Sequence, residues 1–227
     1  MDMYDIVRNF KRPDDSLINN YNLMTSATLH EVLQRRGALS SYIKPIWPGM
    51  KLCGSALTVQ CEPGDNLMIH KALAIAKPGD VLVVSVGGYV EAGFWGEVMT
   101  IAAISRGIKG LLTDGSVRDT MAIKEHGFPI FSKGICIKGT TKLTPGKINH
   151  QLILGGICIN PGDIILGDND GVVVVPLEEA EKALSGAIAR EEKEKILMQK
   201  LESGQLTMDL LNLNDPFNEL GLKEEMV

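Results

Sequence analysis

The sequence has few cysteines and no long hydrophobic run. Its cysteines form no CxxC pair, which argues against a cysteine zinc site or a dithiol redox motif; they are Cys53, Cys61, Cys136 and Cys158. No window of about 18 uncharged apolar residues occurs, so neither a membrane-spanning helix nor a membrane partner is predicted. The first residues, MDMYDIVRNFKRPDD, lack the apolar core of a signal peptide. We therefore expect a cytoplasmic protein with reduced thiols.

Motifs for nucleotides and for histidine-based metal sites are also missing. The four histidines are scattered singly and spell neither HxxxH nor HExxH, so a histidine metal cluster is not predicted. No GxGxxG occurs, which argues against a dinucleotide or S-adenosylmethionine loop. Lys and Arg number 23 against 28 Asp and Glu, without a basic block, and this balance argues against nucleic acid as a partner.

The composition that remains is that of a folded globular protein. Hydrophobic residues make up 44% and charged residues 22% of the 227 residues, which excludes disorder as the main state. A chain of this length buries about 70% of its unfolded surface and needs no disulfide to fold. We expect an N-terminal helical segment over 1–24, an α/β core domain over 25–176, and a C-terminal helix and tail over 177–227 that contacts a neighbouring subunit.

Strands and helices alternate through the middle of the chain. The run VLVVSV has the apolar, β-branched character of a strand buried on both faces. It begins a strand–helix–strand–helix–strand series, the βαβαβ pattern of a parallel sheet, at 81–86, 97–106, 109–114, 120–127 and 128–134. Two more strands are predicted at 148–160 and 163–175, and one long charged helix at 178–202.

Two loops that follow neighbouring predicted strands combine glycine with charge. GGYVEAGFWGE ends at Glu97, and GSVRD ends in Arg118 and Asp119. Because the carboxyl ends of parallel strands meet at one edge of a sheet, we expect both loops to face one crevice, where α/β proteins bind ligands. The spacing is specific, since 20 residues separate Glu97 from Arg118.

This arrangement, Gly96-Glu97 and then Arg118-Asp119, resembles the acidic-X20-Arg-Asp signature of the class II, metal-dependent pyruvate aldolases. These are the 4-hydroxy-4-methyl-2-oxoglutarate or 4-carboxy-4-hydroxy-2-oxoadipate aldolases, which share their fold with the regulator of ribonuclease activity A. The resemblance covers roughly residues 25–205 and includes GDNLMIHKAL, PGDVLVVSV, RGIKGLLTDGSVRD and GDNDGVVVVP. The best-known aldolases have Asp where this chain has Glu97, while the regulator-type relatives lack an acid there, so Glu97 favours an enzyme.

The resemblance implies an overall architecture. The fold would be α/β, an α-β-β-α sandwich of the swivelling β/β/α type, with a βαβ-built core and a mixed sheet. The chain would assemble as a homotrimer or a dimer of trimers, which is a hexamer. The active sites would lie at subunit interfaces.

The resemblance also implies roles for individual residues. Arg118 would stabilise the charge of a pyruvate enolate, and Asp119 would be the direct ligand of Mg²⁺ or Mn²⁺. The substrate carboxylate would bind the backbone N–H groups of a helix N-terminus, which is a natural anion site, at Gly96, Glu97, Val98 and Met99. The side chain of Glu97 would hold a water on the metal and shuttle a proton. A glutamate of the neighbouring subunit would approach the metal through water, with Glu194 as the best match and Glu191 next.

These roles predict a metal-dependent lyase that acts on a small 2-oxo acid. It would cleave a 4-hydroxy-2-oxo diacid by retro-aldol reaction to release pyruvate, and it would decarboxylate oxaloacetate through the same enolate. The first alternative is a non-enzymatic regulator that binds another protein. The others are a Schiff-base aldolase, with a buried lysine such as Lys109, and a methyltransferase.

Simpler interpretations compete at several of these positions. Asp119 is a candidate N-cap, and Glu97 suits a helix N-terminus on electrostatic grounds alone. Glycines at the site fit turn geometry. We expect structural roles for a set of other residues. Asp114 is either structural or a support of the site, and His70 is a packed core residue or, alternatively, lines the pocket. Phe94 and Trp95 are expected to pack rather than to stack on substrate, Cys61 and Cys158 to be buried, and 168–171 to form a hairpin turn.

Overall fold

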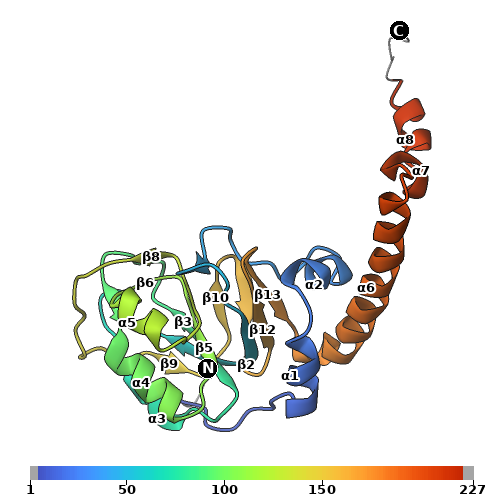
Figure 1. The fold of residues 1–227 in the computed structure, drawn as a ribbon. Coiled ribbons are helices and arrows are strands. Elements are labelled where there is room, and N and C mark those ends of the chain that lie inside the picture. The colour runs from blue at the N-terminus through green and yellow to red at the C-terminus, as the bar shows by residue number, and fades with distance from the viewer. Residues whose placement is uncertain (1–4, 222–227) are drawn as a thin grey trace.

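The computed structural model describes residues 5–221 and has an α/β fold built on a curled, mixed sheet (Figure 1). The eight strands of this sheet are β1 (Lys44–Pro45), β2 (Leu52–Gln60), β3 (Asp80–Ser85), β5 (Gly110–Thr113), β7 (Ile130–Ser132), β9 (Lys147–Ile148), β12 (Ile164–Gly167) and β13 (Val172–Val175). The order is β1-β7-β5-β3-β2-β12-β13, and β9 pairs with β2. The predicted α/β class with a mixed sheet is confirmed.

The centre of the sheet is the predicted βαβ series. β2, β3, β5 and β7 pair in parallel. The connections between them contain α3 (Leu67–Ile75), α4 (Glu97–Ser105) and α5 (Thr120–Glu125). β1, β12 and β13 add antiparallel pairs at the two sides. The crossover helices cover one face of these parallel strands and the inner core of the curled sheet covers the other, so both faces are buried and the strand sequences are uniformly apolar.

Two halves of the curled sheet pack against each other between helical layers. Val81 and Val83 of β3 point into an inner core that also contains Ile165 of β12 and Val174 of β13. The alternate residue Leu82 joins the core beneath α3, α4 and α5. Successive side chains of a strand point to opposite faces, so the two faces of the sheet have separate cores. The layers follow the predicted α-β-β-α order.

The second helical layer covers the outer face of β12 and β13. It consists of α1 (Asp15–Tyr21), α2 (Ser26–Val32) and α6 (Ala180–Glu202), which share a third apolar core with those strands. The hydroxyl of Tyr21 donates a hydrogen bond of 2.7 Å to the carbonyl of Ala180 and ties α1 to the start of α6. No helix within residues 5–221 is both long and apolar enough to cross a membrane.

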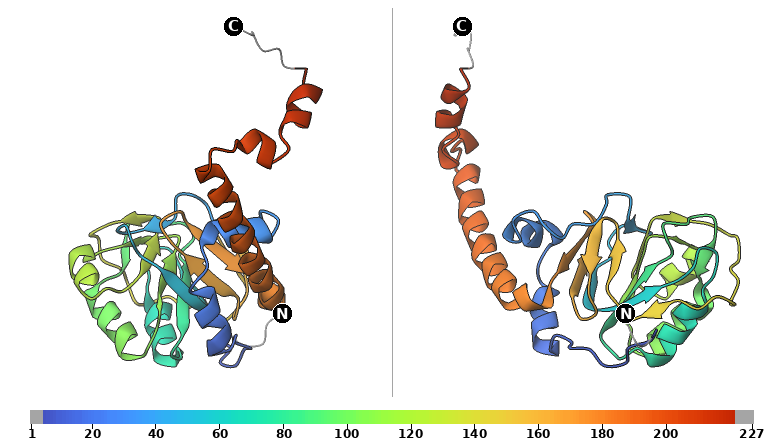
Figure 2. Two further views of the ribbon diagram at one scale, coloured as in Figure 1. Left: turned by 45° about the vertical axis from the view of Figure 1, so that its right-hand side comes forward. Right: turned by 180° about the vertical axis from the view of Figure 1, so that it is seen from behind.

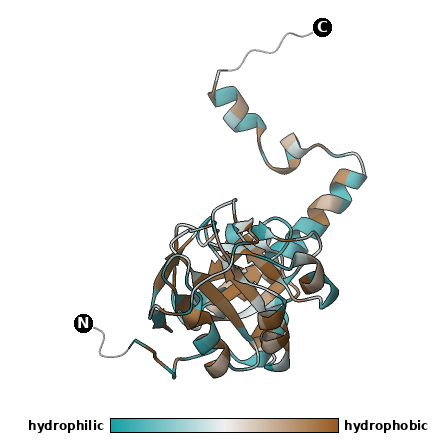
Figure 3. Cartoon of the chain, turned by 90° about the vertical axis from the view of Figure 1, so that its left-hand side faces the viewer, coloured by the Kyte–Doolittle hydropathy of each residue, from teal (hydrophilic) through white to brown (hydrophobic). Residues whose placement is uncertain are grey.

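The C-terminal helix leaves the body of the molecule. α6 follows a short 3-10 helix (Leu177–Glu179) and projects outward, and α7 (Thr207–Leu210) and α8 (Asn214–Glu219) lie beyond it (Figure 2). Hydrophobic residues concentrate in the central strands, whereas the projecting helices carry mixed apolar and polar stretches (Figure 3). The long charged helix predicted at 178–202 is confirmed, since the 3-10 helix and α6 together span this range.

Two predicted strands are instead strand pairs. Within 148–160, β10 (Leu152–Leu154) and β11 (Ile157–Ile159) form a hairpin, because Gly155 and Gly156 adopt positive φ angles between them. Within 163–175, the chain reverses at 168–171 between β12 and β13, which confirms the predicted hairpin turn. Cys61 is buried as expected, but the burial predicted for Cys158 is wrong, because it pairs with exposed Ile153 on the outward face of its hairpin.

A small three-stranded sheet completes the fold and shapes the functional region. β4 (Gly93–Trp95), β6 (Ser116–Val117) and β8 (Gly134–Ile135) pair in parallel. β4 leads directly into α4, and β6 leads through two residues into α5. The starts of these two helices are therefore held side by side.

Candidate active site

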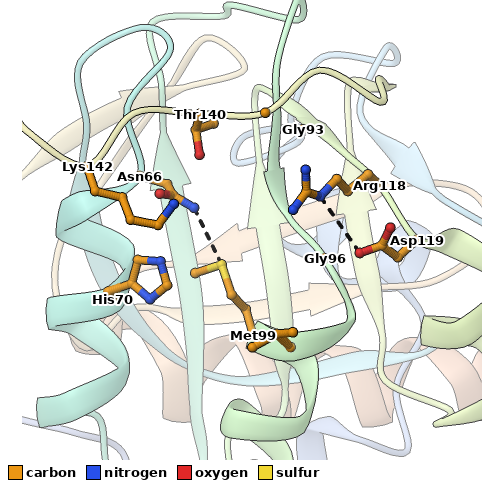
Figure 4. Close-up of a pocket in the computed structure, with 11 residues that line it drawn as sticks. Asn66, His70, Gly93, Gly96, Met99, Arg118, Asp119, Thr140 and Lys142 are labelled. Carbon is orange, nitrogen blue, oxygen red and sulfur yellow. Dashed lines mark hydrogen bonds and ion pairs between the residues drawn. The ribbon is translucent and has the colours of Figure 1, made fainter.

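A cleft of about 350 Å³ lies where these segments meet. Four pieces of chain form it: the start of α3, the junction of β4 and α4, the junction of β6 and α5, and a loop after β8 (Figure 4). Its lining residues are Asn66, His70, Gly93, Gly96, Val98, Met99, Arg118, Asp119, Gly139, Thr140 and Lys142.

Arg118 and Asp119 lie on one side of the cleft, next to the start of α4. Trp95 pairs with Val117 across the parallel strands β4 and β6, so the residues that follow each strand become neighbours. The N–H of Arg118 donates to the carbonyl of Trp95 at 2.9 Å. Parallel pairing thus brings together the two motifs that are 20 residues apart in sequence.

The carboxylate of Asp119 serves the neighbouring helix. Asp119 precedes α5 with a left-handed φ of 57°, but its side chain makes no hydrogen bond to the N–H groups of α5. Its Oδ2 atom accepts a hydrogen bond of 3.1 Å from the N–H of Glu97 and lies 3.8 Å from Nε of Arg118. The carboxylate therefore links both motifs, and the simple N-cap interpretation accounts only for its position in the chain.

Two glycines make room for these side chains. A Cβ on Gly96 would meet Oδ2 of Asp119 and would lie 3.3 Å from the Arg118 side chain. A Cβ on Gly93 would meet the carbonyl of Cys136 and would also approach Arg118. Gly96 has a φ of −150°, which any residue can adopt, so space rather than turn geometry requires glycine here.

The first turn of α4 is open toward the cleft. Gly96 at the N-cap has no side chain to satisfy the first N–H groups of the helix. Among the described residues, none is recorded as a hydrogen-bond acceptor for the N–H of Val98 or Met99. The partial positive charge of a helix N-terminus is therefore available to an anion.

The side chain of Glu97 is directed elsewhere. Its Oε1 atom lies 3.2 Å from Nε2 of His126 on α5, and the side chain is not among those that line the cleft. A role for Glu97 on a bound water requires the carboxylate to turn away from His126.

The opposite side of the cleft contains Asn66 and Lys142, which sequence reasoning missed, and His70, for which a pocket position was only the alternative interpretation. Figure 4 shows Asn66, His70 and Lys142 facing Arg118 and Asp119 across it. His70 is exposed and lines the cleft, so the predicted core position is wrong and the alternative position in the pocket is confirmed. The i, i+4 spacing of Asn66 and His70 places them on one face of α3, a signal that could have identified this pair. Partial burial, together with the charge of Lys142, lowers the pKa of His70.

Other predicted structural roles are confirmed. Phe94 and Trp95 are buried, and Trp95 stacks on Phe128 with ring centroids 5.8 Å apart. The carboxylate of Asp114 accepts hydrogen bonds from the N–H groups of Val86 and Gly88, and so holds the loop after β3. Lys109 is exposed and lies outside the cleft, which removes it as the buried lysine of a Schiff-base aldolase.

The cleft offers one carboxylate to a cation, which suits a metal ion that retains most of its water ligands. Asp119 is the one carboxylate among the lining residues, and residues 5–221 contain no cluster of three or more His, Cys, Asp or Glu that could hold a metal. Magnesium often binds one or two carboxylates and retains several waters, so Asp119 suits it. The helix α6 of the same chain, which contains Glu194, lies on the other side of the sheet from the cleft (Figure 1). Within it, Glu194 pairs with Arg190 at 2.8 Å.

Known proteins share both the sequence and the fold. A protein of Halalkalibacterium halodurans named "Putative 4-hydroxy-4-methyl-2-oxoglutarate aldolase" is 37% identical over 170 residues, which cover 75% of this chain and 81% of that protein. The similar crystal structures include the following two. An uncharacterized protein from Pseudomonas syringae pv. tomato has a TM-score of 0.80 at 28% identity over 91% of this chain and 97% of its own. Streptomyces coelicolor RraAS2, an unusual member of the RNase ES inhibitor RraA protein family, has a TM-score of 0.77 at 30% identity over 84% and 99%.

The family model described as "RraA-like: Aldolase/RraA" matches residues 22–174, a span that contains all the residues lining the cleft. The match covers more than half of the chain. This protein therefore belongs to the RraA-like family of aldolases and RraA proteins.

Proposed function

We propose that this protein is a divalent-metal-dependent lyase that cleaves a 4-hydroxy-2-oxo diacid by retro-aldol reaction and releases pyruvate. The observation that carries the proposal is that Arg118, Asp119 and the open first turn of α4 face one cleft. The family includes aldolases, and the relative from Halalkalibacterium halodurans carries the name of an aldolase for such a substrate.

The start of α4 would bind the carboxylate next to the keto group. The N–H groups of Val98 and Met99 are open, whereas that of Glu97 already donates to Asp119. The resemblance to the aldolases suggested the N–H groups of four residues, 96–99. Because two of these, Val98 and Met99, are open, they would donate the main hydrogen bonds to the carboxylate. Val98 is also highly exposed, so an anion can reach this turn from solvent.

Arg118 would stabilise the charge that forms during cleavage. The C3–C4 bond breaks, its electron pair moves into the C2–C3 unit, and negative charge appears on the keto oxygen of the resulting pyruvate enolate. A guanidinium stays protonated at all relevant pH values and offers several N–H donors to that oxygen. The 3.8 Å separation of Nε from Asp119 leaves the guanidinium able to turn toward substrate. Decarboxylation of oxaloacetate forms the same enolate and would use the same groups.

Asp119 would hold Mg²⁺ or Mn²⁺ at the cleft. Its Oδ2 is fixed by the Glu97 N–H, and its side chain is 44% exposed, which leaves the other oxygen accessible. A bound divalent cation would polarise the keto oxygen and share the stabilisation of its charge with Arg118. Glu97 would orient a water and carry a proton once its carboxylate turns from His126.

Assembly would complete the site. Glu194, or Glu191 one turn earlier on α6, would reach the cleft of a neighbouring subunit in a trimer or a dimer of trimers. The projection of α6 away from its own domain supports this arrangement (Figure 2). Several exposed apolar side chains on α6 and the following segment also suit a subunit contact, among them Ile196, Met198, Leu206 and Leu211.

A protein-binding regulator is the second candidate, because one similar structure is a member of the RNase ES inhibitor RraA protein family. The deciding experiment incubates the protein with 4-hydroxy-4-methyl-2-oxoglutarate and Mg²⁺ and follows pyruvate by NMR. Cleavage that stops when EDTA is added supports the lyase. If substrate stays intact with Mg²⁺ and with Mn²⁺, the lyase proposal fails and the regulator becomes the leading hypothesis.

A further inference from the structure

The side of the cleft opposite Arg118 has polar atoms that make no hydrogen bond within the part of the chain that the structure describes. Asn66 is only 5% exposed, and its Nδ2 donates to the Phe94 carbonyl at 3.0 Å and approaches Sδ of Met99 at 3.6 Å. These contacts fix the amide orientation, and Oδ1 of Asn66 is left buried without a hydrogen-bond partner within the described chain. An unsatisfied buried acceptor costs free energy, so Oδ1 of Asn66 is available to a hydrogen-bond donor in the cleft, either water or a ligand that replaces it.

Two further donors lie beside this acceptor. Lys142 and the ring of His70 line the cleft on the same side as Asn66 (Figure 4). Neither side chain has a recorded hydrogen bond or ion pair with any residue in 5–221. A lysine ammonium and an imidazole N–H at one end of a cleft suit a carboxylate.

A buried carboxylate holds the loop that carries Lys142. Oδ2 of Asp65 accepts hydrogen bonds from the Thr141 hydroxyl at 2.7 Å, from the Leu143 N–H at 2.6 Å and from the Thr144 N–H at 3.1 Å. These bonds surround Lys142 in sequence, so Asp65 fixes the backbone from which the lysine extends. Asp65 is 2% exposed and touches none of the cleft, which makes it a positioning residue.

We propose that Asn66, His70 and Lys142 form a subsite for an α-hydroxy-carboxylate group, the far end of the diacid substrate. Lys142 and His70 bind its carboxylate, and Oδ1 of Asn66 accepts a hydrogen bond from its hydroxyl. This inference rests on the proposed function, in which Arg118 and the start of α4 bind the 2-oxo acid end.

The chemistry of the substrate matches this division of the cleft. In a 4-hydroxy-2-oxoglutarate, the shortest such diacid, the hydroxyl and the second carboxylate are attached to the same carbon, C4. Cleavage turns the C4 hydroxyl into a carbonyl, and the hydroxyl proton leaves as the C3–C4 bond breaks. C3 gains a proton in return, so the reaction needs no oxidant or reductant. Asn66 orients the hydroxyl that becomes this carbonyl but does not itself take the proton.

The test compares two substrates that differ in one group. 4-Hydroxy-4-methyl-2-oxoglutarate carries the second carboxylate, and 4-hydroxy-4-methyl-2-oxopentanoate has a methyl group in its place. Lys142→Met should lower kcat/KM for the diacid roughly 10- to 100-fold, the scale of one hydrogen bond to a charged group, and lower the ratio of diacid to monoacid kcat/KM by a similar factor. Lys71→Met is the matched control, because Lys71 is exposed one residue from His70 and does not line the cleft.

The neighbouring residues give separate readouts. Asn66→Ala should slow both substrates to a similar extent, because both carry the 4-hydroxyl. Asp65→Asn should lower the ratio of diacid to monoacid kcat/KM, a change that a general loss of folded protein does not produce. Thermal melts of each variant show the folded fraction.

The outcomes separate the subsite from the underlying function. Wild-type protein that cleaves neither substrate contradicts the proposed function and this subsite with it. Wild-type protein that cleaves both equally well, or Lys142→Met that weakens both substrates equally or neither, overturns the subsite and leaves the lyase intact. A diacid-specific loss in Lys142→Met, absent in Lys71→Met, establishes it.

Discussion

The Oδ2 atom of Asp119 accepts a hydrogen bond of 3.1 Å from the backbone N–H of Glu97. The residue before α5 thereby holds the first turn of α4, and the two halves of the motif become one unit. This contact leaves the N–H groups of Val98 and Met99 facing the cleft, together with the guanidinium of Arg118. The geometry therefore joins an anion site to a carboxylate that suits a cation.

A substitution of Gly96 tests whether the close packing of α4 against Asp119 and Arg118 is needed for activity. Gly96→Ala would place a methyl group against Asp119 and Arg118. Because its φ angle suits alanine, we expect a folded protein whose pyruvate release falls by about 10²-fold, the scale for a misplacement of about 1 Å in an active site. Circular dichroism melts and the pyruvate assay measure the two effects. Full activity in this variant would show that the contact is not needed.

Metal affinity distinguishes Asp119 from Glu97. Asp119→Asn should weaken Mn²⁺ binding at least about 10-fold, as measured by electron paramagnetic resonance of free Mn²⁺. Glu97→Gln is the comparison, because the Glu97 side chain pairs with His126, does not line the cleft and would act on the metal only through a water. It should weaken Mn²⁺ binding less than Asp119→Asn does. Equal losses in the two variants would contradict the assignment of Asp119 as the direct ligand.

Asp65 makes stability depend on pH in the acid range. Burial would raise its pKa, but hydrogen bonds from Leu143, Leu67 and Thr141 outweigh burial and lower the pKa to about 2. Because the folded pKa lies below the unfolded value, the charged carboxylate contributes on the order of 1–2 kcal/mol above about pH 4. That contribution is lost as the pH falls from about 4 to 2.

Urea unfolding at several pH values measures this contribution. Asp65→Asn should be less stable than wild type at pH 7, and the difference should shrink as the pH approaches 2. Exposed Glu62→Gln is the control. A difference that stays constant with pH would contradict the linkage.

A second buried carboxylate should matter for stability and little for chemistry. Asp80 is fully buried and receives two hydrogen bonds from Arg12, at 2.7 and 3.0 Å. Arg12→Met removes the partner of a buried charge and should destabilise the protein by about 3 kcal/mol. Denaturant unfolding measures this effect, and exposed Arg8→Met should stay within about 0.5 kcal/mol of wild type. A stable Arg12→Met protein would contradict the importance of this ion pair.

Local sequence patterns predicted much of the fold because strong rules govern those segments. Buried parallel strands need uniformly apolar residues, and parallel strands place their following loops at one edge. These two rules are enough to predict that Glu97 and Arg118 lie near each other. The hairpin at Gly155 and Gly156 is not predicted, because both flanking segments are apolar and periodicity alone does not reveal a reversal between them.

The opposite wall of the cleft was harder to predict. Lys142 lies in an irregular loop that is placed by its bonds to Asp65, which is 77 residues away in sequence. His70 has a sequence environment like that of a core residue, and its exposure depends on which face of α3 meets the sheet. The direction of the Glu97 side chain depends on His126 of another helix, so no motif could specify it. Tertiary contacts decide all three positions.

The most direct test is pyruvate release from oxaloacetate, coupled to lactate dehydrogenase, with Mg²⁺ and then with excess EDTA. The blank with metal alone is subtracted, because free divalent cations decarboxylate oxaloacetate. We predict protein-dependent turnover that EDTA abolishes and that Arg118→Ala lowers by roughly 10²–10³-fold, the scale for one preorganised donor to an oxyanion. No turnover above the blank with Mg²⁺ or Mn²⁺, or an Arg118→Ala protein as active as wild type, would contradict the enolate site.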